Sequence, residues 1–153
     1  MMLETGAPTG PVVGLSAEFR APRGKVFDAW TQPALLSKWF FVEAGYRTHD
    51  VIVDLAPLRP YQIVVTPDAG ESTRIHGTFV QVVPGERLVY TWTGACADEQ
   101  YWTLVNVTFA DKEGGGSRVE LDHGVFRTDA DRAMHEQGWF ACVSGLDRLL
   151  SEG

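Results

Sequence analysis

The residues most suggestive of chemistry lie near the C-terminus, in the stretch HEQGW from His135 to Trp139. It differs by one residue from H-E-x-x-H, in which two histidines four residues apart bind zinc and the glutamate activates a water. Trp139 stands where the second histidine would be, and the other histidines, at positions 49, 76 and 123, do not stand at ligand spacing. The sequence therefore predicts no metal site and no cofactor.

Nucleophilic catalysis has no motif to support it. The chain contains no G-x-S-x-G, and the glycine-rich KEGGGS does not lie between a strand and a helix as a phosphate loop does. Cys142 falls inside a predicted helix, where a small buried side chain is expected rather than a thiolate. Cys96 lies in the turn-like segment GACADEQ with no basic residue beside it. No residue is predicted to be catalytic.

His135 and His123 each allow two interpretations. A histidine facing a pocket can exchange one hydrogen bond with the polar end of a ligand, or act as an acid or base if its pKa is shifted. Alternatively, each is a structural histidine bonded to the backbone or to a neighbour, Glu136 or Asp122. The structural interpretation is preferred for each histidine individually.

His123 falls in one of several short strands that alternating apolar and polar residues predict. They are expected at 15–20, 51–55, 61–65, 72–83, 86–92, 101–109 and 117–123. Successive strands joined by turns favour an antiparallel sheet. In the last of them Val119, Leu121 and His123 share one face, so His123 continues an apolar stripe.

Helices are predicted on both sides of this run of strands. Two short helices follow the first strand within APRGKVFDAWTQPALLSKWF, with Thr31 as a cap and Pro33 beginning the second helix. A long C-terminal helix begins at a capping motif, Thr128 to Asp131. One face of it is apolar and comprises His135, Trp139, Val143, Leu146 and Leu150.

Gly138, Cys142 and Gly145 form a stripe of small residues beside that apolar face. Each helical glycine costs about 1 kcal/mol relative to alanine. Two explanations are open: close approach of the helix to the sheet, or room for a ligand.

Composition narrows the possible partners and locations. The 153 residues carry a net charge of -7, and the basic residues are scattered, which argues against nucleic acid and anionic membranes as partners. No signal peptide or bilayer-spanning run is apparent, so a cytoplasmic location without disulfides is expected. Residues 1–14 are predicted to be a flexible N-terminal arm, and residues 15–153 a single domain.

Four blocks carry a resemblance to a known family: VFDAWTQPALLSKWF, VVPGERLVYTW, VNVTFADKEGGGSRVELDHGVF and HEQGWFACVSGLDRLL. They resemble homologues of the activator of the heat-shock protein 90 ATPase (C-terminal-domain type), members of the START-like superfamily, also called SRPBCC or Bet v 1-like. The resemblance implies an α+β helix-grip fold. In it a curved antiparallel sheet of about six or seven strands wraps around the long C-terminal helix, with two short helices after the first strand. Relatives often have a Gly-Gly turn where this chain has Leu58 and Arg59.

The resemblance also implies an apolar cavity between the sheet and the long helix. Superfamily relatives bind lipids, sterols and polyketides, and a few are enzymes such as aromatic cyclases. The side chains expected to face the cavity are Trp39, Tyr61, Trp92, Trp102, His123, His135, Trp139 and Cys142.

Three functions follow as hypotheses. The first is binding of a small hydrophobic molecule without covalent chemistry. The second is a cyclase-like or hydrolase-like enzyme that uses a cavity histidine. The third is a protein-interaction module, either a homodimer or a co-chaperone-like stress-response partner, and fold alone does not choose among them.

Overall fold

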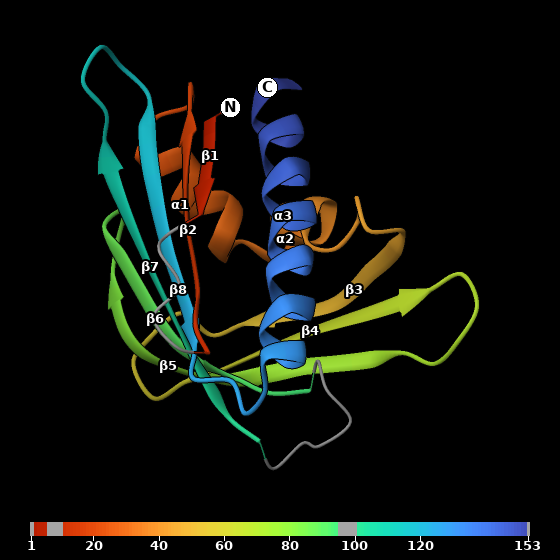
Figure 1. Ribbon diagram of the computed structural model, residues 1–153. Coiled ribbons are helices and arrows are strands. Elements are labelled where there is room, and N and C mark those ends of the chain that lie inside the picture. Colours follow the sequence, from red (N-terminus) through yellow and green to blue (C-terminus); the bar gives the residue numbers. More distant parts are fainter. Residues whose placement is uncertain (1, 6–10, 95–100, 153) are drawn as a thin grey trace.

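The computed structural model describes residues 2–5, 11–94 and 101–152. Its elements, in chain order, are β1 (Met2–Thr5), β2 (Val13–Phe19), α1 (Arg23–Thr31), α2 (Pro33–Trp39), β3 (Tyr46–Val53), β4 (Pro60–Pro67), β5 (Thr73–Val83), β6 (Arg87–Trp92), β7 (Thr103–Asp111), β8 (Ser117–Gly124) and α3 (Asp129–Glu152). The strands form one antiparallel sheet in the order β1-β2-β8-β7-β6-β5-β4-β3. The sheet curves around α3 (Figure 1), which confirms the predicted helix-grip fold.

Alternation along the strands determines which side chains enter the core. In β8, Val119, Leu121 and His123 are buried, and the residues between them face outward. Val13 of β2 and Val105 of β7 lie opposite His123 in the neighbouring strands, and both are fully buried. The predicted apolar stripe that ends in His123 is therefore confirmed.

The two short helices form as predicted, except at their junction. Pro33 occupies the first turn of α2. Thr31 does not cap it, because this residue is the last of α1 and its hydroxyl donates to the carbonyl of Phe27 at 2.9 Å. The indole N–H of Trp39 donates to the carbonyl of Ala29 at 2.8 Å, which fixes α2 against α1.

Helix α3 begins at the predicted cap, where the backbone N–H of Asp131 donates to the hydroxyl of Thr128 at 3.1 Å. Its apolar face is buried, although Leu150 is only half-buried.

The glycines of α3 allow close approach to α2 and the turn after it, not to the sheet. A Cβ on Gly145 would lie 2.8 Å from the carbonyl oxygen of Trp39, and one on Gly138 would lie 2.8 Å from the ring of Phe41. Neither glycine therefore leaves room for a ligand, and both explanations suggested by the sequence are wrong.

The N-terminal residues differ from the predicted arm. Met2–Thr5 form β1 and pair with β2, with Leu3 opposite Ala17, and β2 already begins at Val13. Leu3 packs against the core, a contact that the Gly- and Pro-rich composition of residues 1–14 does not reveal. Residues 6–10 lie outside the described part of the chain.

Leu58 stands where relatives have a glycine turn. Its φ of 67° lies in the left-handed region that glycine adopts without steric cost, and its side chain is 84% exposed. The irregularity of this edge lies inside β3, where the pairing register shifts between His49 and Ile52.

Candidate functional site

Aromatic rings fill the interior between the sheet and α3. Trp139 packs with its ring centroid 6.0 Å from that of Trp30 and 5.6 Å from that of Trp92, and Phe40 lies 5.9 Å from Trp92. These spacings are those of packed aromatic pairs. Most of the region expected to be a cavity is therefore core.

His123 is a structural histidine within this core. The indole N–H of Trp139 donates to its Nδ1 at 3.0 Å, so the ring proton must sit on Nε2. Nε2 then donates to the hydroxyl of Thr103 at 2.7 Å, and that hydroxyl donates to the carbonyl of Trp92 at 3.3 Å. Burial lowers the pKa of His123 well below its ordinary value, and the nearby His135 ring lowers it further.

One ring nitrogen of His135 is hydrogen-bonded, and the other has no partner among the described residues. Its Nδ1 lies 2.7 Å from the carbonyl oxygen of Asp131, which can only accept, so Nδ1 carries the proton and Nε2 is an acceptor. Although His135 is only 5% exposed, Nε2 has no hydrogen-bond partner among the described residues. Burial lowers the pKa of His135, against the opposing effects of its bond to the Asp131 carbonyl and of the Asp131 charge.

His135 lines a cavity of about 110 Å³ at one end of the core. The other lining residues come from the turn after α2 and from β3, β4, β5 and α3, and are Phe41, Tyr46, Val65, Thr73, Ile75 and Met134. The lining is mainly apolar with few polar groups, as in ligand sites, but the volume is well below the roughly 300 Å³ of typical ligand pockets. Deeper in the core, the space beside Tyr61 amounts to only about 20 Å³.

The predicted cavity residues therefore separate into groups. Of the eight, His135 alone lines the cavity of about 110 Å³ and Tyr61 the space of about 20 Å³, whereas Trp39, Trp92, Trp139 and Cys142 are buried in the packed core with His123. Trp102 was placed wrongly: it is 49% exposed and packs against the ring of His76 on the outer side. Because Thr103 faces inward at the start of β7, alternation turns Trp102 outward.

Some lining residues were missed although the sequence held a signal for them. Val65 shares the inward face of β4 with Tyr61, and Ile75 lies on the inward face of β5, as alternation would have indicated. Phe41 gave no such signal, because it belongs to an irregular turn between α2 and β3, and Tyr46 is the first residue of β3, which begins before the strand predicted at 51–55.

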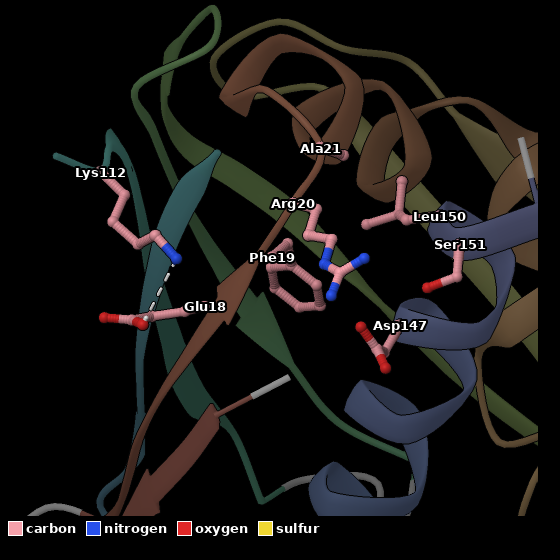
Figure 2. Close-up of a pocket in the computed structure, with 8 residues that line it drawn as sticks. All are labelled: Glu18, Phe19, Arg20, Ala21, Lys112, Asp147, Leu150 and Ser151. Carbon is pink, nitrogen blue, oxygen red and sulfur yellow. Dashed lines mark ion pairs between the residues drawn. The ribbon is translucent and has the colours of Figure 1, made fainter. Parts of the chain in front are cut away.

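A second hollow, of about 600 Å³, lies near the C-terminal end of α3. Figure 2 shows Arg20 pointing toward Asp147 and Ser151 of α3, while Lys112 pairs with Glu18 at 3.6 Å. Its charged side chains are of both signs, so its chemistry favours no single ligand charge.

The described residues contain neither a cluster of metal ligands nor a membrane-spanning helix. Within 2–5, 11–94 and 101–152, no three His, Cys, Asp or Glu side chains gather as metal ligands would. No helix in these ranges combines the length and apolar character needed to cross a bilayer. Cys96 lies outside them.

Comparison with known proteins identifies relatives of the whole fold. A Rhodobacter sphaeroides protein is 19% identical with a TM-score of 0.84, and the match covers 99% of this chain and 100% of that one. An AHSA1-like protein from Aeromonas hydrophila is 21% identical with a TM-score of 0.77 and 92% of each chain covered. A Chromobacterium violaceum protein is 22% identical with a TM-score of 0.78, covering 92% of this chain and 96% of its own. These identities show the fold alone, and none of the curated proteins matches the chain.

The family comparison is more specific than these structural likenesses. Residues 20–151 match the family described as Activator of Hsp90 ATPase homolog 1-like protein. The match spans both short helices, every strand from β3 to β8 and nearly all of α3. The chain therefore belongs to this family, within the START-like superfamily.

Proposed function

We propose that this protein binds a small, mostly apolar molecule in the cavity beside His135. The observation that carries the proposal is a mainly apolar cavity lined by His135, a buried residue whose Nε2 has no hydrogen-bond partner among the described residues. Leaving such a group unpaired costs about 1–3 kcal/mol, which a ligand's donor would recover. Because the protein is expected in the cytoplasm, a metabolite is the natural source of the ligand.

The size of the cavity limits the ligand. Its volume of about 110 Å³ is of the same order as an engineered apolar cavity of roughly 150 Å³ that takes up benzene. A single aromatic ring or a short branched chain matches this space. The lipids and sterols bound by other START-like proteins would require the Phe41 and Tyr46 wall to move.

The enzymatic alternative now depends on one residue. His123 is bonded at both ring nitrogens and fully buried, so it is not available as an acid or base. Nε2 of His135 has no hydrogen-bond partner among the described residues, so this residue is the one on which an acid–base mechanism would depend. The enzymatic and protein-interaction hypotheses remain predictions from the sequence.

Titration with toluene, followed by amide chemical shifts in two-dimensional NMR, tests the binding proposal. Saturable shifts at Val65, Ile75 and Met134 are expected. Val65→Phe should abolish them by filling the cavity. Val64→Phe is the matched control, because the same change on the same strand points to the opposite face and should leave binding intact.

His135→Leu adds a second readout. It replaces an unsatisfied buried acceptor by an apolar group, so the free energy of unfolding should stay the same or rise by about 1 kcal/mol. A residue that reduces stability while lining a cavity is typical of a binding site. Absence of saturable binding of toluene and of any other one-ring probe would overturn the proposal.

A further inference from the structure

A chain of hydrogen bonds joins four polar side chains of β3, β4 and the turn before β5. Nδ1 of His49 lies 2.8 Å from a carboxylate oxygen of Asp50, and Nε2 lies 2.8 Å from the hydroxyl oxygen of Thr66. The Thr66 hydroxyl in turn lies 2.7 Å from that of Ser72. A carboxylate, an imidazole and a hydroxyl joined in this order, through these two ring nitrogens, have the arrangement of the triad of serine hydrolases.

The direction of each hydrogen bond follows from the carboxylate. Because the Asp50 oxygen can only accept, Nδ1 of the neutral His49 ring carries the proton and Nε2 is an acceptor. The Thr66 hydroxyl therefore donates to Nε2 and accepts from the hydroxyl of Ser72. Asp50 thus orients the ring, and His49 is placed to take the proton of Thr66.

An irregularity of β3 brings His49 and Asp50 together. Neighbouring residues of a regular strand point to opposite faces, so their side chains do not meet. Asp50 has a φ of 49°, in the left-handed region, and the pairing register shifts between His49 and Ile52. The side-chain amide of Gln62 donates to the carbonyl of Asp50 at 3.0 Å and supports this bend. Bulges that redirect a side chain, and non-glycine residues at positive φ, are enriched at functional sites.

These side chains are accessible from solvent. Thr48 and Val65 are buried, so alternation turns the next residues, His49 and Thr66, to the outer face of the sheet. The side chain of Asp50 is 71% exposed and that of His49 is 26% exposed. Thr66 is half-buried. A small molecule in solution can therefore approach the hydroxyl that is bonded to the histidine.

Arg47 adds a positive charge beside Thr66. It lies directly opposite Thr66 in the pairing of β3 with β4, and two residues before His49, so all three share the outer face. Side chains paired in this way have Cβ atoms about 5 Å apart, within reach of a guanidinium. Arg47 is exposed and makes no ion pair or side-chain hydrogen bond with another described residue. It can therefore stabilise negative charge that develops on a carbonyl oxygen attacked by Thr66.

We infer that Thr66, His49 and Asp50 form a surface site that transfers the acyl group of a small activated ester to Thr66 and then to water. The Thr66 oxygen attacks the carbonyl carbon while its proton passes to Nε2 of His49. The bond to the leaving alcohol or phenol then breaks, and the leaving group takes that proton. Water repeats the sequence, which releases the carboxylic acid and restores the Thr66 hydroxyl. This activity is separate from binding in the cavity beside His135.

The probe is p-nitrophenyl acetate, which carries a small acyl group and releases a coloured phenol. Peptide mapping by mass spectrometry after an acid quench should locate an acetyl group on Thr66, because acyl-enzymes accumulate in the first turnover. Thr78 is the internal control. It also points outward, from β5, but its hydroxyl adjoins that of Thr91 rather than a histidine, so it should not be acetylated.

Four variants assign the roles. Thr66→Val should abolish acetylation at this position, and Thr66→Ser should retain it. His49→Gln should slow it about 100-fold, as loss of a positioned base does. Asp50→Asn should slow it about tenfold. Because an amide can donate to Nδ1, this variant should also shift the tautomer of His49, which the chemical shifts of its ring nitrogens report.

Two results would overturn the inference. Acetylation of Thr66 at equal rates in wild type and His49→Gln would show that the hydroxyl reacts without the histidine. Release of nitrophenol by Thr66→Val as fast as by wild type, with no acetyl group found on Thr66, would show that another group is the nucleophile. Neither result bears on the binding of toluene in the cavity, so the proposed function is tested independently.

Discussion

Trp139 donates its indole N–H to Nδ1 of His123 across 3.0 Å, and this bond joins α3 to β8 in the middle of the core. Trp139 is the residue that stands in place of the second histidine of a zinc-binding motif. Its role here is to fix the tautomer of a histidine on a strand. Both ring nitrogens of His123 are therefore hydrogen-bonded, whereas Nε2 of His135 has no partner among the described residues.

Trp139→Phe should destabilise the protein by about 1–3 kcal/mol, because it leaves a buried acceptor on His123 without a donor. Urea denaturation monitored by circular dichroism measures this change. Trp102→Phe is the control, because Trp102 is half exposed, and a change within about 0.5 kcal/mol is expected there. Equal effects of the two substitutions would show that the bond to His123 contributes nothing.

Stability should fall as the pH is lowered from 7.5 to 5. A free histidine titrates near pH 6.5, whereas burial lowers the pKa of His123 in the folded state. Below about pH 6.5 the unfolded chain therefore binds a proton that the folded chain excludes, and at pH 5 this costs up to about 2 kcal/mol. His135, the titratable side chain that faces His123, has its pKa shifted in the same direction and adds to the loss.

The contribution of His123 is isolated by comparing the unfolding free energy of wild type with that of a variant at each pH. The difference in unfolding free energy between wild type and His123→Gln should narrow by up to about 2 kcal/mol on going from pH 7.5 to 5. The gap between wild type and Val105→Ala, opposite His123 on β7, should not change. If the unfolding free energies of His123→Gln and wild type changed in parallel with pH, the lowered pKa of His123 would be contradicted.

Gly145→Ala should destabilise the protein by about 1–3 kcal/mol despite the better helix propensity of alanine. The added Cβ would lie 2.8 Å from the main-chain carbonyl of Trp39, which cannot rotate away. Gly24→Ala in α1 is the matched control, since a Cβ there meets no atom within 4 Å, and it should stabilise by up to about 1 kcal/mol. Thermal denaturation of both variants would reveal opposite shifts, and shifts of the same sign would refute the close contact.

Cys142 should be unreactive in the native protein. Burial raises the pKa of its thiol to about 12, and the backbone N–H of Phe41 donates to Sγ at 3.4 Å. In a Cys96→Ser background, an aromatic disulfide reagent at pH 8 should therefore react only as fast as the protein unfolds. Rapid labelling without denaturant would mean that α3 opens locally.

The arrangement of the elements was predictable because it depends on patterns that repeat. Alternation placed Val119, Leu121 and His123 on one face, and helical spacing placed Trp139 and Leu146 on another. Strand β1 was not predicted, because four residues are too few to show an alternating pattern within a Gly- and Pro-rich segment.

The site was less predictable, because it depends on distances between elements. The sequence offered His123 and His135 as equivalent candidates. Only the three-dimensional arrangement shows that Trp139 and Thr103 bond both ring nitrogens of His123. It also shows that Nε2 of His135 has no partner among the described residues. Phe41 lies in an irregular turn, whose course no residue periodicity describes, and Tyr46 begins β3 ahead of the strand predicted at 51–55.

The short strand β1 has a consequence for handling the protein in solution. Met2–Thr5 cover part of the outer edge of β2, whose backbone groups would otherwise be open to pairing with another molecule. Unprotected sheet edges are templates for intermolecular association. Trimming these residues, or attaching a tag that displaces them, should therefore promote aggregation before it reduces the stability of the core.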